Sequence, residues 1–204
     1  MTYRCFKASR DAAKLKVEGA RVRYAHSHWC HHALLITAAR TGLRASELFG
    51  LRWEDCDLQA ATVKVHRRYR NGSFDVPKSR TSTRTVPLTG DAVTTLRQWR
   101  VRSPFKAADK LVFCTSKGEP MSGSNVARRG VGPAATRAKL VGIGMHALRH
   151  TFGSQLLAAG EDLATVSKVL GHASVAITAA VYMHAVAKPA GQTTAKLEAY
   201  LAGK

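Results

Sequence analysis

Residues 146–184 read HALRHTFGSQLLAAGEDLATVSKVLGHASVAITAAVYMH, and this stretch has the clearest structural signals in the chain. Gly160 and Gly171 are each placed to end a helix, because glycine adopts the left-handed conformation that follows many helix termini. Asp162 is a good N-cap for the helix between them. Apolar spacing and these capping residues predict three consecutive helices, over residues 145–159, 163–170 and 174–182.

The pattern outside this stretch predicts more helices and one small sheet. Gly130, Gly132 and Pro133 fall together inside one helical pattern and predict an interruption there. The expected helices cover residues 28–40, 45–50, 89–99, 122–140 and 193–201. The expected strands cover residues 61–68, 74–77 and 83–88, with a hairpin turn at Asn71-Gly72. The fold class is therefore α+β, mainly α, with a small antiparallel three-stranded sheet.

Net charge is the strongest global property of the chain. Its 32 Lys and Arg residues against 13 Asp and Glu give a formal charge of +19. The segment from Lys64 to Arg84 contains a single acidic residue, Asp75, and no acidic residue lies between Glu119 and Glu161. A compact chain with this much charge repels itself, so we expect a polyanionic partner, namely nucleic acid.

The quoted stretch also holds residues suited to phosphate chemistry. His146 and Arg149 lie one helical turn apart and share a face. The arginine fork fits a phosphate, and a neighbouring histidine can move protons near neutral pH. Leu170-Gly171-His172 and then Tyr182-Met183-His184 follow in order. This order resembles the C-terminal signature of the tyrosine recombinases, the phage integrase family.

Two upstream motifs extend the resemblance. TGLRASELFGLRW (41–53) resembles the first arginine motif of the family, in which Arg44 matches the catalytic arginine and Glu47 the acidic residue that orients it. PKSRTSTRTVPL (77–88) resembles the β-hairpin with the catalytic lysine, matched by Lys78, although Arg80 and Arg84 are rival cations. The resemblance covers about residues 26–185. It implies six catalytic residues: Arg44, Lys78, His146, Arg149, His172 and Tyr182.

The resemblance also implies what each residue does. Tyr182 attacks a DNA phosphodiester, which forms a 3′-phosphotyrosyl link and frees a 5′ hydroxyl. Arg44 and Arg149 stabilise the charge that develops on the phosphate, and His172 adds a hydrogen bond. Tyrosine ionises only near pH 10, so it needs a proton acceptor, for which His146 is the candidate, and Lys78 protonates the leaving oxygen. No metal, ATP or other cofactor is expected, because two guanidiniums stabilise the transition state and the covalent link conserves the bond energy.

One other cluster permits a metal interpretation. It consists of His26, His28, Cys30, His31 and His32, and Cys30 follows His26 by one helical turn, which is a ligand spacing. No further clustered Cys or His completes such a site, and the four cysteines are scattered without paired spacing. We therefore expect the cluster to belong to the first helix of the catalytic domain.

The expected organisation has three parts. A basic lead-in or linker over residues 1–25 precedes a catalytic domain over 26–187. A tail helix over 188–204 follows, with Leu197, Tyr200 and Leu201 on one face. The family places a helical DNA-clamping domain before the catalytic domain, and 25 residues cannot hold it. Tails of this kind pack against a neighbouring subunit in the family.

The expected partner is double-stranded DNA. On DNA we expect a homo-oligomer, namely a tetramer, and in solution a monomer is the alternative state. No signal peptide or membrane span is visible in the sequence, so the expected location is the cytoplasm, at the nucleoid of a bacterium or with a mobile element. Ala147 and Ala179 depart from the usual family residues. The alternative function is a DNA-binding module, or a truncated integrase remnant, without efficient recombination.

Overall fold

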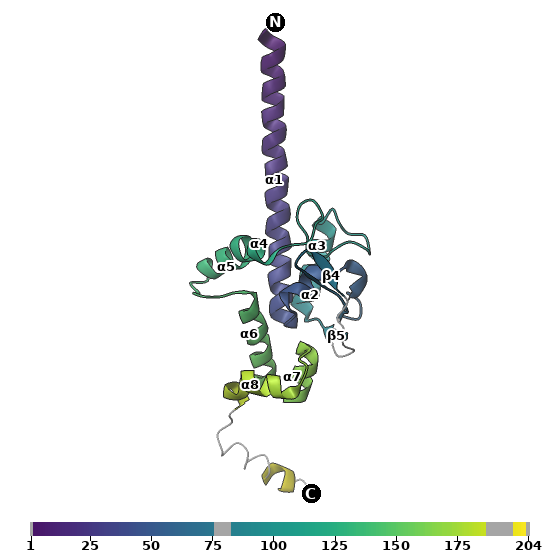
Figure 1. The fold of residues 1–204 in the computed structure, drawn as a ribbon, viewed down its shortest axis with the longest axis vertical. Helices are drawn as coiled ribbons and strands as arrows, with labels where there is room; N and C mark the ends of the chain where they lie inside the picture. Colours follow the sequence, from purple (N-terminus) through teal and green to yellow (C-terminus); the bar gives the residue numbers. More distant parts are fainter. Residues whose placement is uncertain (1, 76–82, 187–197, 203–204) are drawn as a thin grey trace.

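The computed structural model describes residues 2–75, 83–186 and 198–202 (Figure 1). The chain is mainly helical with a small antiparallel sheet, as the sequence predicts. The helices are α1 (Thr2–Thr41), α2 (Ala45–Gly50), α3 (Gly90–Arg102), α4 (Gly123–Val126), α5 (Gly132–Arg137), α6 (Met145–Ala158), α7 (Leu163–Leu170) and α8 (Val175–Val186). A 3₁₀ turn, η1 (Trp53–Asp55), and a π-helical turn, η3 (Ala127–Val131), accompany them. The strands are β1 (Cys56–Asp57), β2 (Thr62–Val65), β3 (Arg68–Arg70), β4 (Ser73–Asp75) and β5 (Arg84–Pro87).

Helix α1 is much longer than the pattern predicts. It begins at Thr2 rather than His28, so the segment assigned as a lead-in is the first part of the same helix (Figure 1). The chain has no proline before Pro77, and residues 7–20 are rich in Ala and Lys, which favour helix. The helix ends where Gly42 adopts a φ of +63°. A side chain at Gly42 would meet the ring of Phe152, so this turn brings α1 directly against α6.

The three-stranded sheet is confirmed, but with a different third strand. Its order is β1-β2-β5, and both pairs are antiparallel. Val63 lies opposite both Cys56 and Val86, and these three side chains enter the main core. The predicted strand 74–77 is not part of this sheet, because its described residues pair with β3 in a separate hairpin.

The predicted strand 61–68 is broken at His66 and Arg67. The imidazole Nε2 of His66 lies 2.6 Å from Asp55 Oδ1, and Arg67 donates to Glu54 over 2.9 Å. These bonds to η1 turn the chain out of the sheet and into the β3–β4 hairpin. The hairpin turn is the predicted one, since Asn71 and Gly72 both have positive φ, as a tight two-residue turn requires.

The three consecutive helices of the quoted stretch are confirmed. Asp162 caps α7 by accepting from the backbone N–H groups of Ala164 and Thr165. Gly171 ends α7 in the left-handed conformation, with φ +67°. Between α6, α7 and α8 lies a small second core built on Leu157, Val166, Leu170 and Tyr182, apart from the main core around α1, α3 and the sheet.

The interruption predicted in 122–140 is a π-helical turn rather than a break. Helix α4 runs into η3, and Pro133 then occupies the first turn of α5, where proline is tolerated. In the tail, residues 198–202 are helical and expose Tyr200 and Leu201, while the remainder of the predicted tail helix, including Leu197, lies outside the described residues. No single helix among the described residues is long and apolar enough to span a membrane. Helices α7 and α8 have the required length and apolar character only when taken together, and they are bent by 105° relative to each other.

Candidate active site

Arg44 lies at the junction of α1 and α2 and is held by a buried carboxylate. Glu47 accepts from the Arg44 backbone N–H over 2.9 Å and from Arg44 Nη1 over 3.1 Å. Burial alone would raise the pKa of Glu47, but the bonds and charge of Arg84 and of Arg44 outweigh it and hold that pKa below its ordinary value. Glu47 is therefore ionised and orients Arg44, the role that the resemblance implies.

Arg84 provides the larger part of that charge. It binds Glu47 through both terminal nitrogens, over 3.0 and 2.9 Å, and its Nε donates to Val169 O over 2.8 Å. It also packs against Gly171, where a Cβ would lie 2.7 Å from Arg84 Nη1. The buried Arg84 side chain therefore joins the start of α2 to the end of α7.

Arg149 lies on α6 and is 3% exposed. It donates to Gly42 O over 2.7 Å and to Leu170 O over 2.8 Å. Arg44 reaches the same end of α7, through Leu170 O at 3.5 Å and Gly171 O at 2.8 Å. Burial, followed by the charge of Arg44, lowers the pKa of Arg149 to about 10, so it stays charged at neutral pH. The carbonyl end of α7 thus holds two guanidiniums side by side.

His172 follows directly from this helix end. Its Nδ1 lies 2.7 Å from the hydroxyl of Thr178, which is fully buried in α8. Burial, and then the charges of Arg149 and Arg44, lower the pKa of His172 to about 4. His172 is therefore neutral at pH 7, and with Nδ1 engaged, Nε2 is the nitrogen that can donate to a phosphate.

This pKa predicts a pH-dependent stability. A histidine whose pKa is depressed on folding stabilises the protein fully above its unfolded pKa of about 6.5, and that stability is lost as the pH falls toward 4. We expect the free energy of unfolding to fall more steeply over this range in the native protein than in His172→Gln. Urea unfolding at a series of pH values measures both slopes, and parallel slopes would contradict the prediction.

Tyr182 packs inside the second core. Its side chain is 1% exposed, and its hydroxyl donates to Arg149 O over 3.5 Å. A Cβ at Gly153 would lie 2.6 Å from that hydroxyl, so only a glycine allows the ring to sit there. Burial raises the pKa of Tyr182, although the charge of Arg149 opposes the shift. The hydroxyl therefore faces the backbone of α6, beside Arg149.

A second histidine, His150, contacts both the His146 ring and the Tyr182 ring. His146 is exposed on α6, and its ring centroid lies 4.5 Å from that of His150, which lies 5.8 Å from the ring of Tyr182. Partial desolvation and the charges of His150 and Arg149 lower the pKa of His146. The structure therefore places five of the six expected residues around the junction of α2, α6, α7 and α8.

Comparison with known proteins decides the family. Residues 20–188 match the family model described as "Phage integrase family". The chain belongs to the phage integrase family. The tyrosine recombinase XerC-like protein of Caldanaerobacter subterraneus subsp. tengcongensis is 31% identical over 180 residues, which cover 76% of this chain and 46% of the relative. XerC of Xanthomonas axonopodis pv. citri is 36% identical over 152 residues, which cover 74% and 46%.

Solved structures share the integrase-family fold. The Tn1549 transposon integrase in complex with transposon right end DNA has a TM-score of 0.66 at 23% identity, covering 84% of this chain and 59% of that one. XerA recombinase has a TM-score of 0.62 at 24% identity, covering 90% and 61%. The chain spans about half the length of the curated relatives that it matches.

Lys78 of this integrase-family domain lies outside the described residues, in the segment 76–82 between β4 and β5. Its expected role stays a prediction. The rival cation Arg84 is described, and its buried pairing with Glu47 gives it a different task from proton donation. Arg80 lies outside the described residues as well.

Three further residues of the site have roles that the sequence does not predict. The sequence offers Arg84 only as a rival cation to Lys78, yet Arg84 shares the buried face of β5 with Val86, which is the signal that it must be paired. His150 lies between His146 and Tyr182, which its position in the sequence does not predict. Nothing in the pattern marks Gly153, because its importance depends on the ring that packs against it.

The basic segment 64–84 is also less free than the sequence suggests. Asp75 is its only acidic residue in sequence, but acidic partners arrive from elsewhere in the fold. Arg67 contacts Glu54 and Asp55 of η1, and Arg84 contacts Glu47 of α2. Part of this positive charge is therefore neutralised inside the integrase-family domain.

The histidine cluster of the first helix does not form a metal site among the described residues. No group of three or more His, Cys, Asp or Glu side chains in the described part of the chain is placed to hold a metal ion. His26 Nε2 lies 3.1 Å from Cys114 O, and His31 Nδ1 lies 2.6 Å from Ser27 O. The segment is part of α1, as predicted.

Proposed function

We propose that this protein cleaves and rejoins DNA strands through a covalent 3′-phosphotyrosine intermediate at Tyr182, and so acts as a site-specific recombinase or integrase. The proposal rests on one arrangement: Arg44 and Arg149 both bind the carbonyl end of α7. His172 follows that helix end, and the Tyr182 hydroxyl lies at Arg149 O. Family membership and the solved integrase–DNA complex with this fold support it.

Each residue has a chemical role in this proposal. The two guanidiniums bind the nonbridging oxygens of the scissile phosphate, displacing their present backbone carbonyl contacts in part, and neutral His172 donates a further hydrogen bond. Attack by the Tyr182 oxygen on phosphorus forms the phosphotyrosyl ester and breaks the bond to the 5′ oxygen. The phenol proton passes toward His146, for which His150 is a relay, and Lys78 protonates the leaving oxygen.

Attack requires a movement of α8. The Tyr182 hydroxyl is buried and bonded to a backbone carbonyl, so a phosphate held by the two arginines reaches it only after the ring turns away from Gly153. Reversal of the same steps by a 5′ hydroxyl rejoins the strand without ATP. Exchange between two duplexes needs more than one active site, so we place copies of the protein together on DNA, in the bacterial cytoplasm at the nucleoid.

A nicked suicide substrate tests the proposal. The nick lets a short 5′-hydroxyl fragment diffuse away after cleavage, so the covalent intermediate accumulates and appears as a slower band under denaturing conditions. We expect mass spectrometry to map the DNA to Tyr182. Absence of a covalent complex with DNA that the protein binds, or attachment at another residue, would overturn the proposal.

Substitution of Arg149 by Lys is expected to slow covalent complex formation by roughly 100-fold, because a lysine cannot present two parallel donors to a phosphate. Binding to duplex DNA should change little, since the charge is kept. The matched control is Arg97→Lys, whose side chain donates to Leu58 O at the surface. Equal cleavage rates for the two variants would contradict the role of Arg149.

The second candidate function is DNA binding without turnover. The burial of the Tyr182 hydroxyl and its raised pKa favour it, because this arrangement holds the nucleophile away from solvent. This candidate predicts salt-dependent DNA binding, no covalent complex on the suicide substrate, and no functional difference between the native protein and Tyr182→Phe.

A further inference from the structure

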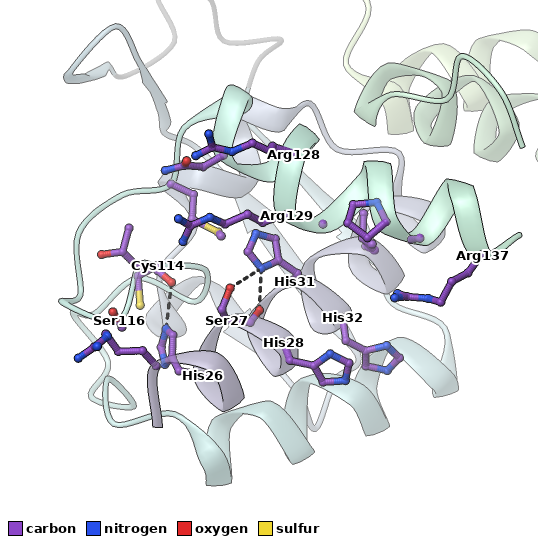
Figure 2. Close-up of a pocket in the computed structure, with 18 residues that line it drawn as sticks. His26, Ser27, His28, His31, His32, Cys114, Ser116, Arg128, Arg129 and Arg137 are labelled. Atoms are coloured by element: carbon purple, nitrogen blue, oxygen red, sulfur yellow. Dashed lines mark hydrogen bonds between the residues drawn. The ribbon is translucent and has the colours of Figure 1, made fainter. Parts of the chain in front are cut away.

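A cavity of about 660 Å³ lies apart from the candidate active site, between α1 and the α4–η3–α5 segment (Figure 2). On one side it is lined by His26 and His31 of α1, and Cys114 lines it from the segment before α4. The opposite wall contains Arg129 of η3 and Arg137 of α5. His31 is ten residues before the end of α1, or about 15 Å of helix, and Arg44 lies beyond that end. The volume is in the range that holds a small organic ligand.

The wall of this cavity is strongly cationic. Four arginines line it, and none of the described lining residues is an Asp or Glu. In contrast with Arg44, Arg67 and Arg84, none of the four has an ion pair with a carboxylate among the described side chains. The four are Arg23, Arg128, Arg129 and Arg137. Positive charge gathered in a concave site without a counter-ion favours an anionic ligand.

His31 adds a buried polar atom without a partner. The residue is 7% exposed, and its Nδ1 lies 2.6 Å from Ser27 O and 3.2 Å from Ser27 Oγ. Its Nε2 is buried and has no hydrogen-bond partner among the described residues. Figure 2 shows the His31 ring among the side chains that line the cavity, with Nδ1 turned to Ser27 and Arg129 on the other side of the ring. A buried, unpaired nitrogen of this kind calls for an explanation, and a ligand supplies one.

The backbone of the wall opposite α1 leaves room for the His31 ring. Gly130 allows the His31 ring to come close, because a Cβ there would lie 2.6 Å from His31 Cδ2. Gly130 belongs to the π-helical turn η3, which also carries Arg128 and Arg129. Single π-helical turns occur often at functional sites, since they re-aim side chains at a local cost in stability.

We propose that this cavity binds a phosphate group, held by Arg128, Arg129 and Arg137 and by Nε2 of His31. Guanidiniums bind phosphate oxygens in pairs of parallel hydrogen bonds, and no carboxylate among the described side chains forms an ion pair with these arginines. The phosphate can belong to a free phosphate ester or to the backbone of DNA. This site is distinct from the proposed catalytic one, so its occupation does not depend on Tyr182 or Arg149.

Binding couples to the protonation of His31. The pKa of His31 is lowered, mainly by burial and further by the charge of Arg129. The hydrogen bond to the Ser27 carbonyl acts in the opposite direction and does not outweigh them. A bound anion offsets the charge of Arg129 and attracts a proton to Nε2, which then donates to the phosphate. The pKa of His31 should therefore rise when the site is filled.

Histidine side-chain NMR of the full chain tests this site directly. The chain has nine histidines, and substitution assigns the signals of His31 and His172, which report the cavity and the active site separately. Inorganic phosphate, a nucleoside monophosphate and a short DNA duplex are each titrated at constant ionic strength. We expect a saturating shift of the His31 signal and a higher His31 pKa in the filled state.

Variants make the result specific. Arg129→Ala, and separately Arg137→Ala, should weaken the His31 response by roughly tenfold, because each removes a charge-assisted bond, while the His172 response stays unchanged. Lys106→Ala, a surface charge elsewhere, is the control. A response to phosphate and the monophosphate assigns the site to a free phosphate ester, and a response to the duplex alone assigns it to DNA. No His31 response to any probe, or the same response in both variants as in the native protein, would overturn the proposal.

Discussion

Replacement of Tyr182 by Phe is expected to abolish the covalent protein–DNA complex completely while leaving the fold intact. The oxygen of Tyr182 is the atom that joins phosphorus in the proposed reaction, and phenylalanine offers no substitute. The ring fills the same space among Leu157, Val166 and Leu170, so the second core is kept. The lost hydrogen bond, at 3.5 Å to Arg149 O, is long, so the free energy of unfolding should change by no more than about 1 kcal/mol.

The control is Tyr69→Phe, the same chemical change in the β3–β4 hairpin, where the ring packs against Phe74. It should leave covalent complex formation on a nicked suicide substrate unchanged. Binding of both variants to intact duplex should match the native protein, because no charge is altered. A covalent complex that persists in Tyr182→Phe would contradict the role given to this residue.

Replacement of Arg84 by Ala is expected to lower the free energy of unfolding by about 3–5 kcal/mol and to slow strand cleavage. Both side chains of the Arg84–Glu47 pair are buried, with 6% and 7% exposure. Removing the arginine leaves the buried Glu47 carboxylate with Arg44 as its remaining ion-pair partner among the described residues, and frees the end of α7 at Val169. Cleavage slows because Glu47 and the α7 end together position Arg44 and His172.

Arg40→Ala provides the matched control, since its pair with Asp91 is exposed, at 44% and 48%, and contributes at most about 1 kcal/mol. The double variant Arg84→Met with Glu47→Leu separates the effect on the free energy of unfolding from the effect on the positions of the catalytic side chains. It should recover much of the lost stability, because no buried charge is left unpaired, but not the cleavage rate. Urea unfolding and the suicide-substrate assay measure the two effects. A loss of stability in Arg84→Ala no larger than in Arg40→Ala would contradict the account.

The sequence predicted the helices of the site well, because their signals are local. Asp162 and Gly171 mark the two ends of α7, and the structure uses both as caps. The spacing of His146 and Arg149 places them on one face of α6, and five of the six expected residues come to one junction. Lys78 lies outside the described residues, so its role stays a prediction.

Longer-range features were predicted less well. Helix α1 begins well before the predicted helix 28–40, because the preceding Ala- and Lys-rich segment favours helix by composition but is only weakly periodic. The third strand of the sheet was misassigned because the contacts of His66 and Arg67 with η1, which break the strand, depend on acidic residues more than ten positions away.

The residue types suited to the chemistry, their order along the chain and the helices that carry them all follow from the sequence, since helix periodicity and capping act over a few residues. Three relationships depend instead on how distant segments pack: Glu47 is balanced by Arg84, His150 lies between His146 and Tyr182, and the Tyr182 hydroxyl contacts the α6 backbone at Gly153. Burial sets these relationships, and with them the low pKa of His172, because the loss of water around a group depends on which distant segments pack over it.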